Sequence, residues 1–206
     1  MRIGLLGGSF NPAHQGHRLI SQRALQVLKL QQIWWLVSPQ NPLKPRLGMA
    51  PFAERVAHAK AVAQHPRIRV CEIEASLGTQ FTIDFLKQAR RRYPRYHFVW
   101  LAGADILTDL HRWRRWLEIF ATTPIAIFDR PGYVFGGMRG KAAQRFMASR
   151  AKPEQAAGLA WRRPPAWMLV TGPRSRQSAS AIRRGNLPMI GPTKTAAKDA
   201  KGRTTP

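Results

Sequence analysis

Apolar residues along this chain fall into short runs that are separated by segments with helical spacing. Six segments have the length and pattern of strands, at residues 3–6, 33–37, 67–73, 96–101, 125–128 and 167–170. Between the first two, apolar residues recur at helical spacing from Ile20 to Leu30, and the same spacing covers residues 52–64. Buried strands that alternate with helices are typical of a parallel sheet covered on two sides. The pattern therefore predicts an α/β fold built on an open parallel sheet.

The last third of the chain carries a weaker pattern. Residues 134–165 are rich in glycine, alanine, glutamine and basic residues, and only residues 141–150 show helical spacing. We expect a flexible connection there, inside a single domain that spans residues 1–184. Residues 185–206 contain little that could be buried, so we expect a basic, disordered tail.

Composition narrows the class of protein. A chain of 206 residues is long enough for one α/β core, and no apolar run approaches the length of a membrane span. The amino terminus enters a strand directly, which predicts that no signal peptide precedes the fold. A single cysteine, Cys71, agrees with a reducing compartment. We therefore expect a soluble cytoplasmic protein without a membrane partner.

The charge of the chain is strongly positive. It has 34 Lys and Arg residues against 10 Asp and Glu residues, a formal net charge of +24. Such a field attracts polyanions, which include nucleic acids and triphosphate substrates alike. The basic residues match no recognised nucleic-acid reader motif, so charge alone leaves both a nucleic-acid-binding protein and a nucleotide-binding enzyme open.

The most informative stretch is residues 7–17, GGSFNPAHQGH, between the first strand and the first helix. Paired glycines let backbone N–H groups approach an anion, and a helix N-terminus adds partial positive charge. His14 and His17 would share a face of the first helical turn and could donate to phosphate oxygens. In the alternative, these histidines only cap the helix. The glycine spacing excludes the dinucleotide fingerprint, and no Gly-Lys-Ser/Thr follows to make a Walker loop.

Other polar residues follow strands that are predicted to end at the same edge of the sheet. Lys44 lies in a proline-rich loop after the second strand, and Asp105 follows a turn at Gly103 after the fourth. Ligands bind at this edge in open parallel sheets, so Lys44 could contact a phosphate and Asp105 a ribose diol. The alternatives are a solvated surface lysine and an aspartate that caps the following helix. Residues 175–183 combine hydroxyls with arginine before a further helix, which suits phosphate binding.

Residues 111–116 also show helical spacing and combine two tryptophans with three arginines. Trp113 and Trp116 are three residues apart and would share a face of that helix. Core packing explains one of them easily. The flanking arginines indicate a partly open rim, where the other could stack on a heteroaromatic ring.

Residues 7–17 satisfy every fixed position of the signature GG[ST]F[DN]PxHxGH, and so resemble the ATP-binding loop of the H-x-G-H nucleotidyltransferase superfamily. Over residues 1–184 the resemblance narrows to the bacterial nicotinate-mononucleotide adenylyltransferases. The motifs that narrow it are the proline-rich loop ending at Lys44, FTIDFL at 81–86, GADIL at 103–107, Trp113 and RPG at 130–132.

The resemblance implies a Rossmann-like doubly wound parallel sheet of the nucleotidyltransferase type. It implies transfer of the adenylyl group of ATP to nicotinate mononucleotide, giving nicotinate adenine dinucleotide and pyrophosphate in NAD biosynthesis. It also implies Mg²⁺ held by the ATP phosphates, and leaves a homo-oligomer open. The nearest alternative is another adenylyl- or cytidylyltransferase of the superfamily with a different phosphate acceptor.

The resemblance also implies the residues of the site. Catalytic roles fall on His14 and His17. The residues implied for ATP are Gly7, Gly8, Ser9, Phe10, His14, His17, Gly103, Asp105, Ser178, Ser180 and Arg183. Those implied for the pyridine nucleotide are Lys44, Thr82, Trp113 and Arg130. Three positions depart from the family pattern: Gln177 replaces an aliphatic residue, Ala179 replaces a hydroxyl, and Arg114 stands where an aromatic residue is common.

Overall fold

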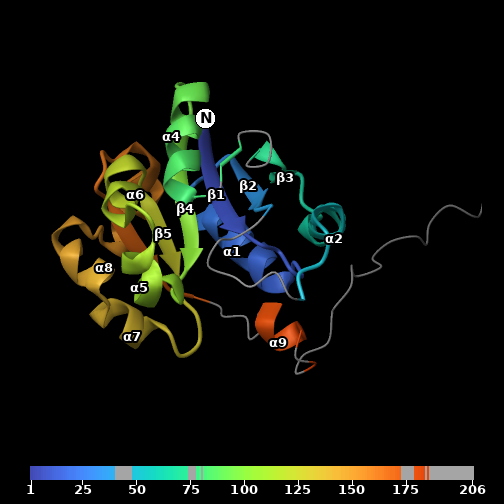
Figure 1. The fold of residues 1–206 in the computed structure, drawn as a ribbon. Helices are drawn as coiled ribbons and strands as arrows, with labels where there is room; N and C mark the ends of the chain where they lie inside the picture. The colour runs from blue at the N-terminus through green and yellow to red at the C-terminus, as the bar shows by residue number, and fades with distance from the viewer. Residues whose placement is uncertain (40–47, 74–77, 80, 173–178, 184, 186–206) are drawn as a thin grey trace, which may run out of the picture.

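A computed structural model describes residues 1–39, 48–73, 78–79, 81–172, 179–183 and 185. Within them, a six-stranded sheet has the strand order β3-β2-β1-β4-β5-β6 (Figure 1). Every neighbouring pair is parallel. The strands are β1 (Arg2–Gly8), β2 (Gln32–Val37), β3 (Ile68–Cys71), β4 (His97–Gly103), β5 (Ile125–Phe128) and β6 (Trp167–Val170). The chain moves outward from β1 to β3 and then restarts beside β1 with β4, so the predicted Rossmann-like doubly wound sheet is confirmed.

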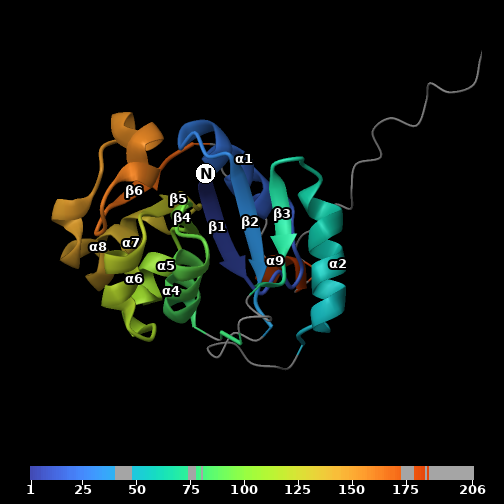
Figure 2. The ribbon, with the colours of Figure 1, turned by 90° about the horizontal axis from the view of Figure 1, so that it is seen from above.

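Helices cover both faces of the sheet. One face packs against α1 (Gln15–Val27), α2 (Phe52–Ala63) and the 3₁₀ segment η3 (Pro153–Trp161). The other packs against α4 (Thr82–Arg92), α5 (Ile106–Asp109), η1 (Leu110–Arg112), α6 (Trp116–Thr122) and α8 (Lys141–Arg145). Helix α2 lies beside β3, at the opposite end of the sheet from α7 (Val134–Arg139) and α8 (Figure 2). The remaining segments are η2 (Met147–Ser149) and α9 (Ala179–Arg183).

Strand side chains alternate between two buried cores. Trp34 joins the core under α4, and Trp35, the next residue, joins the core under α1. Gly4 in β1 has no room for a side chain, because an added Cβ would lie 2.7 Å from the Ile33 side chain and 2.8 Å from that of Leu101. Burial on both faces explains why these strands read as continuous apolar runs. No helix in the described part of the chain is long and apolar enough to cross a membrane.

Residues 134–165 differ from the flexible connection that the sequence predicted. They form α7, α8, η2 and η3, and the expected helix at 141–150 ends at Arg145. The small residues that weakened the sequence pattern allow close packing: a Cβ on Gly140 would lie 2.7 Å from the Leu107 carbonyl oxygen. Leu159 is fully buried against the sheet. The predicted tail lies outside the described residues, apart from Gly185.

Candidate active site

The carboxyl ends of β1, β4 and β5 bring the predicted residues to one edge of the sheet. The glycine loop leaves β1, Asp105 follows β4, and Arg130 follows β5. Helix α9 lies at the same edge (Figure 1). Parallel strands meet with their carboxyl ends together, so a single crevice receives side chains from distant parts of the sequence.

His14 and His17 form a reciprocal cap at the start of α1. His14 is the residue before the helix, and its Nδ1 accepts a hydrogen bond from the Gly16 amide at 3.1 Å. The His14 amide in turn donates to Nδ1 of His17 at 3.2 Å. Because both Nδ1 atoms are acceptors, the neutral rings carry their proton on Nε2. The two histidines therefore cap the helix, and the same hydrogen bonds fix the tautomer in which Nε2 of each ring carries the proton.

Burial keeps His14 neutral. Its side chain is 4% exposed, and desolvation, aided by the charge of Arg130, lowers the pKa of His14 to about 4. The imidazole of His14 is thus uncharged at neutral pH. The two rings lie 3.9 Å apart between centroids, and His17 also packs on Phe10 at 4.7 Å.

The lowered pKa of His14 predicts a loss of stability in acid. An unfolded histidine has a pKa near 6.5, so between about pH 6.5 and pH 4 the unfolded chain binds a proton that the folded chain excludes. The free energy of unfolding should therefore fall by about 3 kcal/mol as pH falls through this window. His14→Asn keeps a capping oxygen without this titration and should lose less. Urea unfolding of both proteins at pH 7 and pH 4 measures the difference, and equal losses would contradict the assignment.

The glycine loop is open where a ligand would approach. An added Cβ at Gly7 would have no atom within 4 Å, and at Gly8 it would make only ordinary contacts with Phe10. Packing therefore does not require a glycine at position 7, whereas the close approach of an anion to the backbone would. Phe10 as a whole is only 1% exposed, and its ring stacks on Trp35 at 5.1 Å, so this side chain belongs to the core.

Asp105 and Arg130 form an ion pair across this edge. Arg130 Nη1 donates to Asp105 Oδ2 at 2.8 Å. The pair lies over Gly103, where an added Cβ would come 2.4 Å from Asp105 Oδ1 and 3.0 Å from Arg130 Cδ. Asp105 precedes α5 but makes no side-chain cap to it, so the capping alternative is wrong for this residue. A side chain at position 103 would therefore displace the ion pair from its present geometry.

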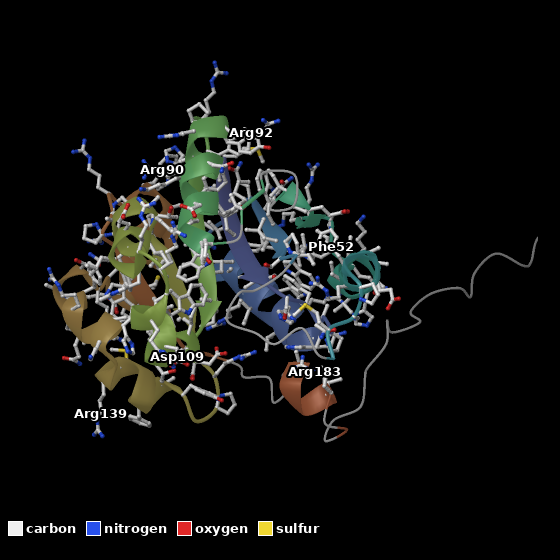
Figure 3. The ribbon with its side chains drawn as sticks, in the orientation of Figure 1. Phe52, Arg90, Arg92, Asp109, Arg139 and Arg183 are labelled. Atoms are coloured by element: carbon white, nitrogen blue, oxygen red, sulfur yellow. The ribbon has the colours of Figure 1, made fainter. Side chains whose placement is uncertain are left out.

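Arg183 brings the late serine-arginine segment to the glycine loop. From α9 it donates a hydrogen bond to the Asn11 carbonyl oxygen (Figure 3). Ser180 belongs to the same helix. Ser178 and Lys44 lie outside the described residues.

Residues 111–116 do not form the single helix that the sequence predicted. Trp113 has extended backbone at the end of η1, and Arg115 has left-handed backbone, with φ of 52°, before α6 begins at Trp116. The two tryptophans therefore face different neighbours. Trp113 packs on Trp100 at 5.9 Å, and Trp116 meets the edge of Phe146 at 6.0 Å.

Arg114, which stands where the family pattern has an aromatic residue, packs on an aromatic ring. Its guanidinium lies 4.7 Å from the centre of the Phe81 ring, a cation–π contact. Phe81 immediately precedes α4, and Thr82 is the first residue of that helix. The Trp113 segment and the predicted Thr82 site are therefore in contact through Arg114.

Arg55 in α2 is a further residue at this edge that the sequence pattern did not predict. Its side chain is 3% exposed and contacts no carboxylate within the described residues. Instead it donates to four backbone carbonyls, at 2.7 Å to Ser9, 2.8 Å to Ser38, 2.9 Å to Pro39 and 3.0 Å to Ala50. It thus ties the glycine loop to the end of β2. The available signal was its place on the apolar stripe of the helix, three residues after Phe52.

A shallow hollow, open to solvent, adjoins the start of α1. Its lining includes Gly16, Ile20, Phe128, Arg130, Val170 and Thr171. Burial raises the pKa of the Cys71 thiol to about 11, which argues against a thiolate nucleophile. Among the described residues, no group of three or more His, Cys, Asp and Glu side chains is placed to hold a metal ion.

Comparison with known proteins gives consistent matches. Residues 5–185 match a family model described as cytidylyltransferase-like. The chain is 50% identical over 183 residues to a "probable nicotinate-nucleotide adenylyltransferase" of Methylorubrum extorquens (strain PA1), covering 89% of this chain and 99% of the relative. It is 46% identical over 186 residues to a protein of the same name from Rhizobium johnstonii, covering 90% and 94%. In fold it resembles a Plasmodium falciparum nicotinic acid mononucleotide adenylyltransferase complexed with NaAD, with a TM-score of 0.66, 18% identity, and coverage of 89% and 82%.

Proposed function

Because this chain belongs to the cytidylyltransferase-like family, with nicotinate-nucleotide adenylyltransferases among its relatives, we propose that it transfers the adenylyl group of ATP to nicotinate mononucleotide. The products are nicotinate adenine dinucleotide and pyrophosphate, in NAD biosynthesis. The observation that carries this function is the reciprocal His14–His17 cap beside a glycine loop that is open to an anion: both Nδ1 atoms accept backbone hydrogen bonds, so Nε2 of each ring is the donor that we propose for phosphate.

ATP would occupy the crevice between the glycine loop, α5 and α9. The imidazole N–H groups and the loop amides donate to its phosphates, and Asp105 accepts from its ribose. Arg183 already reaches the loop and adds a guanidinium. The full set proposed for ATP is Gly7, Gly8, Ser9, Phe10 through its backbone, His14, His17, Gly103, Asp105, Ser178, Ser180 and Arg183.

The pyridine nucleotide would enter on the side of α4 and η1. Trp113 provides a ring for stacking, and Thr82 lies at the start of α4, where partial positive charge favours the pyridine carboxylate. Arg130 lies beside Asp105 with its side chain 24% exposed, and we propose it for the phosphate of the acceptor. Lys44 is proposed for the same phosphate.

The chemistry needs positioning more than acid–base catalysis. A phosphate oxygen of nicotinate mononucleotide attacks the α-phosphorus of ATP, the bond to the bridging oxygen breaks, and pyrophosphate leaves with that electron pair. The attacking phosphate is already ionised at neutral pH, so no general base is required. His14 and His17 donate to oxygens that gain charge in the transition state, and because His14 is neutral its donor proton stays in place.

We propose that Mg²⁺ arrives with ATP. The donors that line the crevice are imidazole, guanidinium and backbone N–H groups, and Asp105 is engaged by Arg130. The ligands of the ion would therefore be phosphate oxygens and water. The bound ion supplies neutralisation of the charge that develops on pyrophosphate.

The direct test is incubation with ATP, magnesium and each candidate acceptor, followed by mass detection of products. We expect the mass of nicotinate adenine dinucleotide, with pyrophosphate released in equal amount. Product formed only with a non-pyridine acceptor would instead favour another transferase of the superfamily. Absence of any transfer, together with steeply salt-dependent binding of DNA or RNA, would favour the nucleic-acid alternative.

Trp113→Ala should separate the two substrates. Loss of the stacking ring is expected to raise KM for nicotinate mononucleotide about tenfold, while KM for ATP changes little. Steady-state kinetics with each substrate varied in turn measures both constants. Trp161→Ala is the matched control. Trp161 is 58% exposed on η3 and packs on His97, at the amino end of β4 and away from the proposed site, so its loss should alter neither KM. Equal weakening of both substrates by Trp113→Ala would contradict the stacking role.

A further inference from the structure

The turn between η1 and α6 has an unfavourable backbone conformation at its centre. Arg115 is a non-glycine residue in the left-handed region, with φ of 52° and ψ of 38°. Residues with a Cβ disfavour this region unless surrounding contacts compensate. The turn also sets the direction of the chain at Trp113, two residues earlier, whose amide donates to the Leu110 carbonyl at 3.0 Å.

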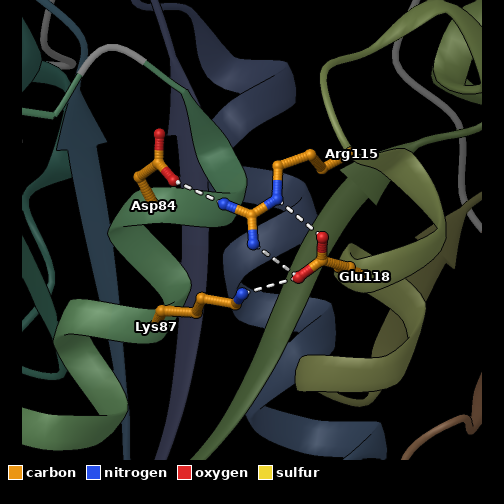
Figure 4. A network of polar contacts seen from close by, with 4 residues as sticks. All are labelled: Asp84, Lys87, Arg115 and Glu118. Atoms are coloured by element: carbon orange, nitrogen blue, oxygen red, sulfur yellow. Dashed lines mark hydrogen bonds and ion pairs between the residues drawn. The ribbon is translucent and has the colours of Figure 1, made fainter.

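The Arg115 side chain is the centre of a four-residue network (Figure 4). It donates to both carboxylate oxygens of Glu118, at 2.6 Å and 2.7 Å, and lies 3.5 Å from Asp84. Lys87 donates to the same Glu118 carboxylate at 2.6 Å. The hydrogen bond from Arg115, together with a smaller effect of the one from Lys87, lowers the pKa of Glu118 to about 2. The carboxylate is therefore ionised at any ordinary assay pH.

The network connects the two elements proposed to hold the pyridine nucleotide. Asp84 and Lys87 are on α4, in the turns that follow Thr82, whereas Glu118 is on α6. The same turn places Trp113 and puts Arg114 over Phe81, the residue just before Thr82. The position of Trp113 relative to the start of α4 is therefore tied to the Arg115 guanidinium.

Helix packing alone does not account for this network. Helices α4 and α6 already pack through fully buried residues such as Ile83, Ile119 and Phe120. The four network side chains are 34–41% exposed, and exposed ion pairs add little to stability. A bidentate arginine pair does, however, impose a defined geometry.

We propose that Arg115 is a positioning residue for the pyridine nucleotide, which fixes the 113–115 turn so that Trp113 stands at stacking distance from the acceptor ring bound beside Thr82. This proposal rests on the proposed function. The side chain does not touch substrate. Arg115 lowers the free-energy cost of binding, because the Trp113 ring is already held in position before nicotinate mononucleotide binds.

The test uses two substitutions that accept left-handed backbone, Arg115→Gly and Arg115→Asn. Both should raise KM for nicotinate mononucleotide about five- to tenfold, with KM for ATP nearly unchanged and the melting temperature close to that of the parent. Glu118→Gln should raise the same constant. In the double variant, Glu118→Gln should raise KM for nicotinate mononucleotide little beyond its value in Arg115→Gly alone, because the two residues act as one unit.

Arg112→Ala is the matched control. It removes the same charge three residues away, from a side chain that is 73% exposed and 3.8 Å from Asp109, and should leave both KM values unchanged. If Arg115→Gly and Arg115→Asn leave KM for nicotinate mononucleotide unchanged while Trp113→Ala raises it, the positioning role is wrong and the stacking role stands. If Trp113→Ala has no effect either, the proposed substrate site is wrong.

Discussion

Replacing His17 with alanine is expected to lower kcat about 100- to 1000-fold, the usual loss when one donor to a transition state is removed. The His14 amide occupies Nδ1 of His17, so the proton of the ring lies on Nε2. In the proposed reaction this N–H donates to phosphate oxygens as negative charge develops on them. Steady-state formation of nicotinate adenine dinucleotide measures the loss, and circular dichroism reports whether the fold is retained.

Two further variants separate catalysis from helix capping. His65 also accepts a backbone hydrogen bond on Nδ1, from Arg67 at 3.1 Å, but it lies before β3, at the opposite edge of the sheet. His65→Ala should therefore leave kcat unchanged. His17→Asn offers a capping oxygen without the distant N–H donor, so it should be as slow as His17→Ala. A near-normal kcat in His17→Ala would count against the phosphate-binding role.

Replacing Arg55 with alanine is expected to lower both stability and activity. The substitution leaves four backbone carbonyls without the guanidinium that they share, and hydrogen bonds to a buried charged group contribute about 1.5–3 kcal/mol each at most. Water can replace part of this, so we expect a net loss of about 3 kcal/mol. For a domain of this size the melting temperature would fall by about 6–12 °C.

Activity should fall with stability, because Arg55 holds the glycine loop at Ser9 against the end of β2 at Ser38. We expect kcat/KM for ATP to fall more than tenfold, since small displacements of donors are costly in a positioned site. Arg55→Lys is the matched variant: it keeps the charge but cannot present the planar fork, and should be intermediate in both measurements. An unchanged melting temperature in Arg55→Ala would contradict this account.

Several features of the fold and the site could be predicted from residues that are close together in the sequence. The six strands, the order of strands and helices, and the glycine loop all depend on local periodicity and on one continuous motif. The same is true of the helix start at His14, because a cap is formed within a few residues. Composition gave a weak pattern for residues 134–165, where Gly137 and Gly140 pack closely on Leu107 in α5.

The amino-acid sequence alone determined the sheet and the position of the glycine loop proposed to bind phosphate, since both are encoded by spacing over short distances. Only the tertiary structure decided which distant groups meet there. Arg55 reaches carbonyls up to 46 residues away, and Arg130 finds Asp105 across 25 residues. It also decided the turn at Arg115, whose backbone is stabilised by side chains on another helix. Contacts of this kind produce no periodic pattern in the sequence. Each depends on the folded chain bringing together residues whose separation in sequence is arbitrary.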